Sequence, residues 1–434
     1  MILAQIASMS LGVVDLVMVG RLGVAELDAA ALGNIWLFGT MIFGMGLMFG
    51  LDPIISQAHG AGEPERIGRA LQQGIVLALL ASIPIAGLWL ATEEVLILTG
   101  QSPDLARAAE TYIQVQIPSL PLFLIFLALR TYLQGRGIVA PVLYVTILAN
   151  GFNVLGNWML VFGNLGCPAL GLYGAGLATC CTRGFMLVGV LGWIWLARLH
   201  HGTWQPWSRS ALDLAGLRVL LRHGVPVGFQ YFLEVWAFQI ATLLAGRLGA
   251  VPLAAHSITL NLASLAFMMP LGIAISASVR IGNLVGAKDH AGARRMAWLA
   301  LGLGGSCMMV SALVFVTLRH HLPGLYNDDP AVVATAATIL PIAATFQLFD
   351  GIQVVGGGVL RGYGNTRPAA VFNFVGYYLL ALPFAALLTF RLGVGLPGIW
   401  WGLVLGLALV ATMLLVWIRM QTRRFSAAPA REPD

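Results

Sequence analysis

Three carboxylates fall inside long apolar runs of the sequence, where acidic side chains are rare. They are Asp15 in the first run, Glu234 in the seventh and Asp350 in the tenth. An acid at the centre of a bilayer costs about 2.5–3.5 kcal/mol on insertion scales. Such a residue usually faces a bundle interior or a wet cavity and marks an ion or substrate pathway. We therefore take these three acids as candidate functional residues.

Glu234 and Asp350 predict a site for a small cation. A low-dielectric environment disfavours a free carboxylate, so each acid is either protonated or paired with a cation at neutral pH. Hard cations such as Na+ prefer oxygen ligands. Amide oxygens could come from four nearby glutamines, Gln230, Gln239, Gln347 and Gln353. The structural alternative is an acid held by hydrogen bonds or by a buried arginine, but no arginine falls mid-run in the seventh or tenth segment. We favour a coupling site that binds Na+ or H+.

Asp15 has candidate partners in Asn153 and Asn157. Their i, i+4 spacing puts both amides on one face of the predicted fifth helix. Arg183, in the sixth run, is the one basic residue expected deep in the membrane, and it is a possible partner for an acid. The alternative is that these asparagines join helices through ordinary interhelical hydrogen bonds.

The composition indicates which elements position these residues. The chain has 434 residues, of which 59% are hydrophobic and 10% charged; soluble domains carry about 25% charged residues. Apolar runs of about 18 or more residues recur throughout, which is typical of a polytopic helical membrane protein. We expect an all-α fold of about twelve transmembrane helices, and the alternating segments of a β-barrel are not seen.

The distribution of charge predicts orientation. The net charge is +6, yet the arginines lie at helix ends and in short loops, which argues against nucleic-acid binding. With the N-terminus inside, basic residues gather on the inner side and most loop acids on the outer side, as the positive-inside rule expects. Both termini are then cytoplasmic. Met1 leads directly into an apolar segment, so we expect no cleavable signal peptide.

An internal repeat divides the chain. GRLG at residues 20–23 recurs at residues 246–249, and LQGRG ending at Gly137 matches LRGYG ending at Gly364. Each half holds six runs, which predicts two lobes of the same topology related by a pseudo-two-fold axis along the membrane normal. We expect an N-terminal lobe at residues 1–199, a cytoplasmic linker at 200–216, a C-terminal lobe at 217–419 and a cytoplasmic tail at 420–434.

The absence of several motifs argues against ATP binding and hydrolysis as the energy source for transport. Lys288 is the only lysine, and no Gly-Lys-Ser/Thr loop is present to cradle ATP phosphates. Neither a GxSxG elbow nor an HExxH motif suggests hydrolysis. The four cysteines show no metal-ligand spacing. Ion-driven transport without a cofactor remains, and the protein is not expected to be an enzyme.

Four segments resemble the multidrug and toxic compound extrusion (MATE) family, most closely its NorM-like branch. They are VDLVMVGRLG at residues 14–23, GAGE at 60–63, FLEVWAF at 232–238 and FDGIQVVGGGVLRGYGNTR at 349–367. The resemblance implies two six-helix bundles that alternate between inward-facing and outward-facing states. It also implies a monomer in the bacterial inner membrane that exports cationic drugs or dyes in exchange for Na+ or H+. By this resemblance Glu234 and Asp350 match the C-lobe cation site, and Asp15, Asn153 and Asn157 match the N-lobe site.

Two alternatives remain open at this stage. A lipid-linked oligosaccharide flippase of the same superfamily would be expected to line its cavity with basic residues, whereas this cavity is expected to be acidic and apolar. A membrane-embedded polyprenyl transferase would need paired acids near a membrane surface, where Asp52 stands alone.

Overall fold

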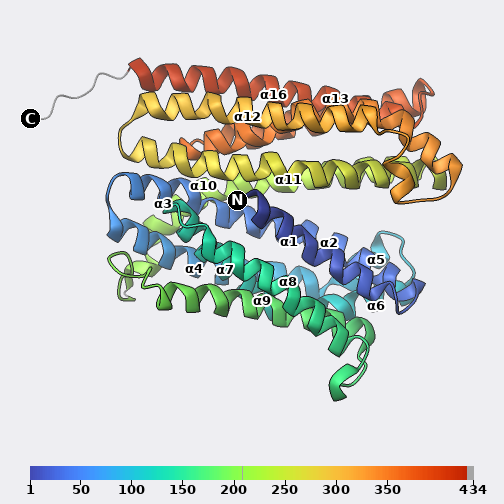
Figure 1. Cartoon of the computed structure of the whole chain (residues 1–434), viewed down its shortest axis with the longest axis horizontal. Helices are drawn as coiled ribbons and strands as arrows, with labels where there is room; N and C mark the ends of the chain where they lie inside the picture. Colours follow the sequence, from blue (N-terminus) through green and yellow to red (C-terminus); the bar gives the residue numbers. More distant parts are fainter. Residues whose placement is uncertain (208, 428–434) are drawn as a thin grey trace, which may run out of the picture. The chain divides into compact units, whose positions relative to one another are not determined.

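The computed structural model describes residues 1–207 and 209–427, and helices make up most of this part of the chain (Figure 1). The described residues contain no strand. They fall into two compact units, one made essentially of residues up to Gly228 and the other of residues from Phe229 on. The predicted all-α polytopic fold is confirmed.

Unit 1 contains the first nine α-helices and two short 3-10 turns. They are α1 (Ile2–Val19), α2 (Val24–Phe49), α3 (Leu51–Gly60), α4 (Pro64–Leu90), α5 (Thr92–Leu98), α6 (Pro103–Gln114), α7 (Ser119–Gly135), α8 (Ala140–Leu160), η1 (Asn164–Gly166), α9 (Gly171–Leu196) and η2 (Arg209–Leu212). Helix α10 (Leu214–Gly246) begins in unit 1 and continues into unit 2.

Unit 2 contains the remaining helices. They are α11 (Ala250–Gly286), α12 (His290–Thr317), η3 (Pro323–Leu325), α13 (Pro330–Gly362), α14 (Arg367–Asn373), η4 (Phe374–Ala381), α15 (Leu382–Ala386), η5 (Leu387–Arg391) and α16 (Leu396–Ala427). Helices α11, α12, α13 and α16 run side by side along the length of the unit (Figure 1). The predicted linker at 200–216 and tail at 420–434 stay predictions, and Ser208 and residues 428–434 lie outside the described part.

Ten helical segments of the described chain are long and apolar enough to cross a membrane. An eleventh is gained if α6 and α7, bent by 52° at their junction, count as one broken span. Helix α8 has 21 residues and occupies the place of the predicted fifth span. It is not among the ten.

The repeat detected in the sequence is visible as equivalent turns in the two units. Gly137 and Gly364 both have a left-handed backbone, with φ values of 79° and 76°. Gly62 (φ 71°) is matched 226 residues later by Lys288, which takes the same conformation with φ 61°. A side chain disfavours this conformation, so the same turn has been kept in both halves despite its cost at Lys288.

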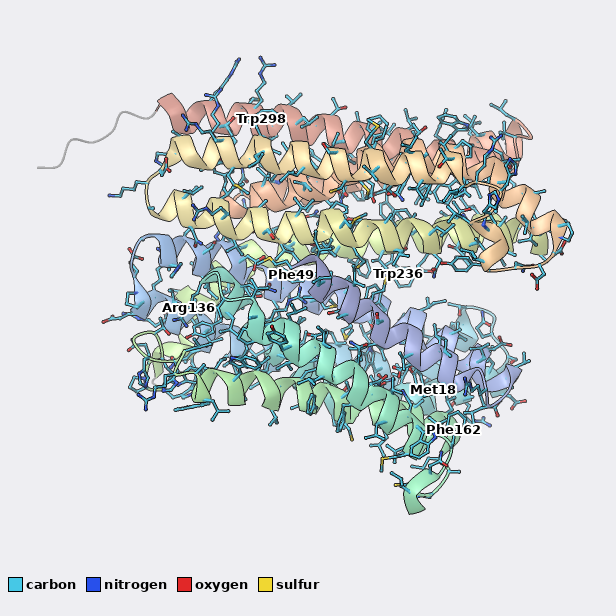
Figure 2. All side chains as sticks on the ribbon, viewed as in Figure 1. Met18, Phe49, Arg136, Phe162, Trp236 and Trp298 are labelled. Atoms are coloured by element: carbon cyan, nitrogen blue, oxygen red, sulfur yellow. The ribbon has the colours of Figure 1, made fainter. Side chains whose placement is uncertain are left out.

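Each unit buries large side chains in its own core and leaves apolar ones on its helix sides. Trp89 and Tyr132 are fully buried in unit 1, as are Trp400 and Tyr377 in unit 2. Ile83 is 69% exposed although it lies in the middle of an apolar helix, as expected for a surface that faces lipid. Figure 2 shows all the side chains on the ribbon.

Met18 and Phe162 lie at one end of unit 1, and Arg136 lies at the other (Figure 2). Which end faces the cytoplasm stays a prediction.

Candidate functional site

Glu234 lies on α10 within unit 2 and is 6% exposed. Its Oε2 accepts hydrogen bonds from Gln353 Nε2 at 3.1 Å and from Asn373 Nδ2 at 3.4 Å. Gln353 Nε2 also lies 3.4 Å from Asn373 Oδ1. Glu234 is therefore held by amides from two other elements, α13 and α14, which leaves its second oxygen available to a proton or an ion.

Asp350, on α13, is 3% exposed and accepts no hydrogen bond from a described residue. It is three residues from Gln353 on α13, and Gln353 donates to Glu234, so the two acids are neighbours. Neither acid forms an ion pair with a basic side chain of the described chain. Two carboxyl groups in this situation cannot both stay charged without a counter-ion. The pair can hold a shared proton, or it can bind a cation with the amide oxygens around it.

Local backbone features bring these groups together. Gly351 follows Asp350 directly, and a Cβ there would lie 2.5 Å from Met308 Cγ, so α12 packs closely against α13 at this level. Asn373 ends α14, immediately before the π-helical segment η4. π-Helical hydrogen bonding is rare and often occurs at functional sites.

Asp15 lies on α1 in unit 1 and is 6% exposed. Asn157 Nδ2 donates to Asp15 Oδ1 at 2.7 Å, and Thr179 Oγ1 donates to Asp15 Oδ2 at 2.8 Å. Asn157 Nδ2 also donates to Asn153 Oδ1 at 3.2 Å. The expected association of Asp15 with the fifth-helix asparagines is present in the structure. Both carboxylate oxygens are occupied, unlike those of Asp350.

Arg183, on α9, is buried near Asp15 but is not in contact with it. Its Nη1 donates to Ser119 Oγ at 2.8 Å, and its guanidinium lies 5.2 Å from the centre of the Phe123 ring. Arg183 therefore forms no ion pair with Asp15 in the described chain.

Two of the four candidate glutamines flank the acid pair. Gln230 is one turn from Glu234 on α10. Its amide packs against Gly357 of α13, where an added Cβ would lie only 2.9 Å from Gln230 Nε2. Gln347 is one turn from Asp350 and is fully buried, and neither its Oε1 nor its Nε2 has a hydrogen-bond partner.

Sequence reasoning missed two residues that contact the acids, Thr179 and Asn373. Asn373 had a detectable signal, because it is an isolated amide within an apolar run. Thr179 had little, since threonines in helices usually bond to their own backbone.

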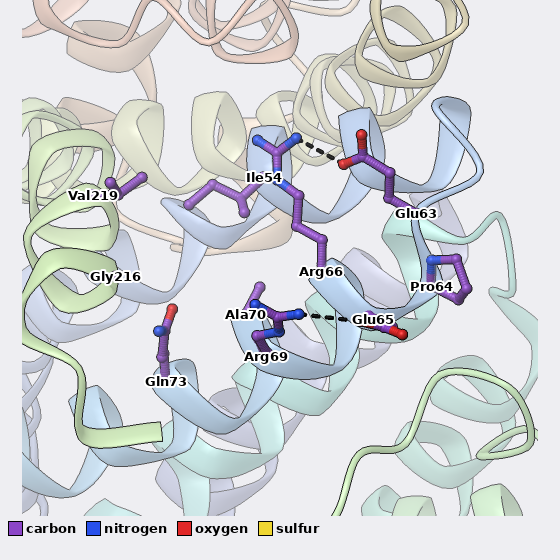
Figure 3. Close-up of a pocket in the computed structure, with 10 residues that line it drawn as sticks. All are labelled: Ile54, Glu63, Pro64, Glu65, Arg66, Arg69, Ala70, Gln73, Gly216 and Val219. Atoms are coloured by element: carbon purple, nitrogen blue, oxygen red, sulfur yellow. Dashed lines mark hydrogen bonds and ion pairs between the residues drawn. The ribbon is translucent and has the colours of Figure 1, made fainter. Parts of the chain in front are cut away.

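A cavity of about 640 Å³ opens in unit 1 away from the acids (Figure 3). It is lined by α3, the start of α4 and the start of α10. Arg66 pairs with Glu63 and Arg69 with Glu65, each at 3.0 Å, so the charges on its wall are already balanced. Within the described chain, no cluster of three or more His, Cys, Asp or Glu side chains could hold a metal ion.

Comparison with known proteins gives consistent results. The MatE family model matches residues 1–159 and 226–387. The sequence is 35% identical over 429 residues to the probable multidrug resistance protein NorM of Bradyrhizobium diazoefficiens, covering 98% of this chain and 92% of that protein.

Solved structures share the fold. The eukaryotic MATE transporter AtDTX14 matches with a TM-score of 0.90 and 25% identity, over 98% of this chain and 95% of that one. A mutant of the Vibrio cholerae MATE transporter VcmN matches with a TM-score of 0.86 and 19% identity, over 98% and 94% of the two chains.

Proposed function

This chain belongs to the MatE family and is NorM-like, and from that premise we propose that it is a secondary active multidrug antiporter. It exports cationic amphipathic drugs or dyes in exchange for Na+ or H+. The family consists of transporters, so the protein is not an enzyme, and the polyprenyl transferase alternative is set aside. The oligosaccharide flippase is disfavoured because the Bradyrhizobium relative, which matches nearly the whole chain, is a probable multidrug resistance protein.

The observation that carries this proposal is the pair Glu234 and Asp350, buried together without a basic partner in the described chain. Burial without compensation is costly for a carboxylate, so the pair must be neutralised by a bound proton or cation. Exchange of that ion for a cationic substrate changes which state of the transporter is favoured, and this links the two fluxes. Asp15 with Asn153, Asn157 and Thr179 supplies a second acidic site in unit 1.

We place the protein in the bacterial inner membrane as a monomer with both termini cytoplasmic. The distribution of arginine between alternate loops supports this orientation. The family needs no cofactor, and we propose Na+ or H+ as the coupling ion.

Dye efflux from everted vesicles tests the proposal. Na+ and H+ gradients are imposed separately on wild type, Glu234→Gln and Asp350→Asn. We expect both variants to lose gradient-driven efflux, because an amide keeps the size of the side chain but cannot exchange a charge. Ser264→Ala is a suitable control, since the Ser264 hydroxyl donates only to Leu260 O of its own helix.

The outcome that contradicts the assignment is wild-type efflux by either variant under both gradients. If ATP alone drives efflux with no ion gradient, antiport itself is wrong.

A further inference from the structure

A cluster of interlocked rings lies in unit 2 beside the acid pair. Phe238 contacts Phe346 and Tyr377, with ring centres 5.9 and 6.0 Å apart. Trp400 contacts Phe346 and His256, with centres 5.7 Å apart in each pair. These rings come from five elements, α10, α11, α13, η4 and α16, and form one continuous set of contacts.

The cluster extends from the acids toward the Gly246 end of α10. Glu234, Phe238 and Thr242 are spaced i, i+4, i+8 and so share one face of that helix. Thr242 is about 12 Å farther along α10 than Glu234, at 1.5 Å per residue. The proposed topology puts the Gly246 end on the outer side of the membrane.

His256 is attached to this face through Thr242. The Thr242 hydroxyl donates to Phe238 O at 3.0 Å and lies 3.1 Å from His256 Nε2. Because its one hydrogen is used by Phe238 O, the hydroxyl accepts from His256 Nε2–H. Neutral His256 then has a lone pair on Nδ1, which is buried and has no hydrogen-bond partner.

Four side chains of the cluster and its border carry buried polar atoms without partners. They are Nδ1 of His256, Nε1 of Trp400, the hydroxyl of Tyr377 and both amide atoms of Gln347. All four residues are 0% exposed. A buried polar group without a partner is destabilising, and a native protein rarely keeps several together without a functional reason.

The polar atoms continue to the acids. Gln347 is one helical turn from Asp350, and Tyr377 is four residues from Asn373, which donates to Glu234. Donors and acceptors are therefore distributed from the acid pair to His256.

We propose that His256 is a proton carrier on a buried route between the Glu234–Asp350 pair and the outer side of the membrane. Water molecules link it to Tyr377 and Gln347. The proposal rests on the antiport function above and names H+ as its coupling ion. In the loading direction a hydronium ion outside gives its proton to His256 Nδ1 and becomes water. The imidazolium N–H then breaks, and the proton passes through water to a carboxylate oxygen, so that imidazole and a neutral carboxyl group remain.

The ring contacts favour a proton over a metal ion on this route. A hydrated Na+ ion could pass only if the rings separated, whereas a proton needs only hydrogen-bonding atoms. The titratable side chains nearest this route on the surrounding elements are Glu234 on α10, Asp350 on α13, and Tyr377 with its neighbour Tyr378 on η4. The same elements also carry titratable side chains farther toward their other ends, which include Arg218, Arg222, His223 and Tyr231 on α10, Arg280 on α11, Arg361 on α13 and Arg419 on α16. His256 forms no ion pair in the described chain, so its protonation is controlled by access to water and to the acids.

The test compares two activities of the purified protein in liposomes. One is proton flux driven by ethidium, followed with a pH-sensitive dye inside the vesicle. The other is ethidium counterflow, in which dye exchanges for dye and no net proton movement is required. The variants are His256→Gln, which keeps a donor for Thr242, and Tyr377→Phe, which removes only the hydroxyl.

We expect both variants to keep wild-type counterflow, while His256→Gln lowers ethidium-driven proton flux about 100-fold, as for loss of a positioned proton-transfer group. Thr259→Val is the matched control. Thr259 is on the same helix, is also 0% exposed, and bonds only to Ala255 O of its own backbone. It should leave both activities unchanged.

Three results would overturn the route. The first is wild-type proton flux in His256→Gln. The second is an equal loss of flux and counterflow, which indicates a structural role. The third is a wild-type protein that exchanges ethidium for Na+ with no proton flux, a result that leaves antiport intact. If no ion gradient drives ethidium at all, the proposed function fails independently of His256.

Discussion

At the scale of single residues, the acids of the two units differ in the hydrogen bonds that they accept. Asp15 receives one short hydrogen bond on each oxygen, from Asn157 and Thr179. Asp350 receives none from the described chain. Hydrogen bonds from neutral donors favour the charged form of a carboxylate, and their absence favours a protonated or ion-bound form. Asp15 is therefore fixed by its neighbours, whereas Asp350 has no described donor to hold a charged form.

Thr179→Val tests the contribution of the hydroxyl to the Asp15 site. Valine keeps the shape of threonine but cannot donate, and a hydrogen bond to a charged group contributes about 1.5–3 kcal/mol. We expect lower thermal stability and weaker drug transport. Thr182→Val is the control, because the Thr182 hydroxyl donates to Ala178 O within its own helix. Equal stability and transport in the two variants would mean that Asp15 does not depend on Thr179.

The same pair of threonines shows the limit of prediction from sequence. An isolated acid in an apolar run is informative by its type, so Asp15, Glu234 and Asp350 could be identified directly. Thr179 and Thr182 are three residues apart on α9, and nothing in their local sequence distinguishes them. Only the rotation of α9 relative to α1 decides which hydroxyl reaches Asp15, and that rotation depends on packing throughout unit 1.

At the scale of helices, the glycine turns made the repeat predictable, but the sequence did not predict the π-helical geometry of η4 and η5. Gly137 and Gly364 mark equivalent left-handed turns, which the matching motifs indicated. The π-helical segments η4 and η5 follow no comparable motif. They depend on how the apolar run between Arg367 and Arg391 packs against α16, since periodicity alone indicates only an apolar helix.

Close helix packing in unit 2 depends on small residues of α13. A Cβ at Gly358 would lie 2.4 Å from Ala274 O on α11. Because this oxygen belongs to the backbone, no side-chain rotation could relieve the clash. We expect Gly358→Ala to destabilise the protein by about 1–3 kcal/mol through overpacking, measured as a lower thermal midpoint in detergent. Gly305→Ala on α12 is the control, because a Cβ at Gly305 would have no neighbouring atom within 4 Å. A lower midpoint in the control alone would contradict this packing argument.

At the scale of the whole molecule, each unit carries its own acidic site on a scaffold of repeated turns. Asp15 is held by hydrogen bonds from Asn157 and Thr179, whereas Asp350 has no such donor in the described chain. The helical scaffold is thus repeated in both units, whereas the acidic residues are not. This asymmetry is what an antiporter needs if one unit chiefly recognises cargo and the other chiefly binds the driving ion.

Such exchange has a direction only if the chain is inserted in one orientation, and the two ends of α12 offer a test. Ala287, before α12, and Asp328, after it, are both exposed in short loops at opposite ends of the helix. The positive-inside rule puts the first loop, next to Lys288, Arg294 and Arg295, in the cytoplasm. In a protein whose four natural cysteines are replaced by alanine, we expect Asp328→Cys to react with a membrane-impermeant maleimide in spheroplasts. Ala287→Cys should react only after permeabilisation, and the reverse pattern would invert both the topology and the proposed direction of proton entry.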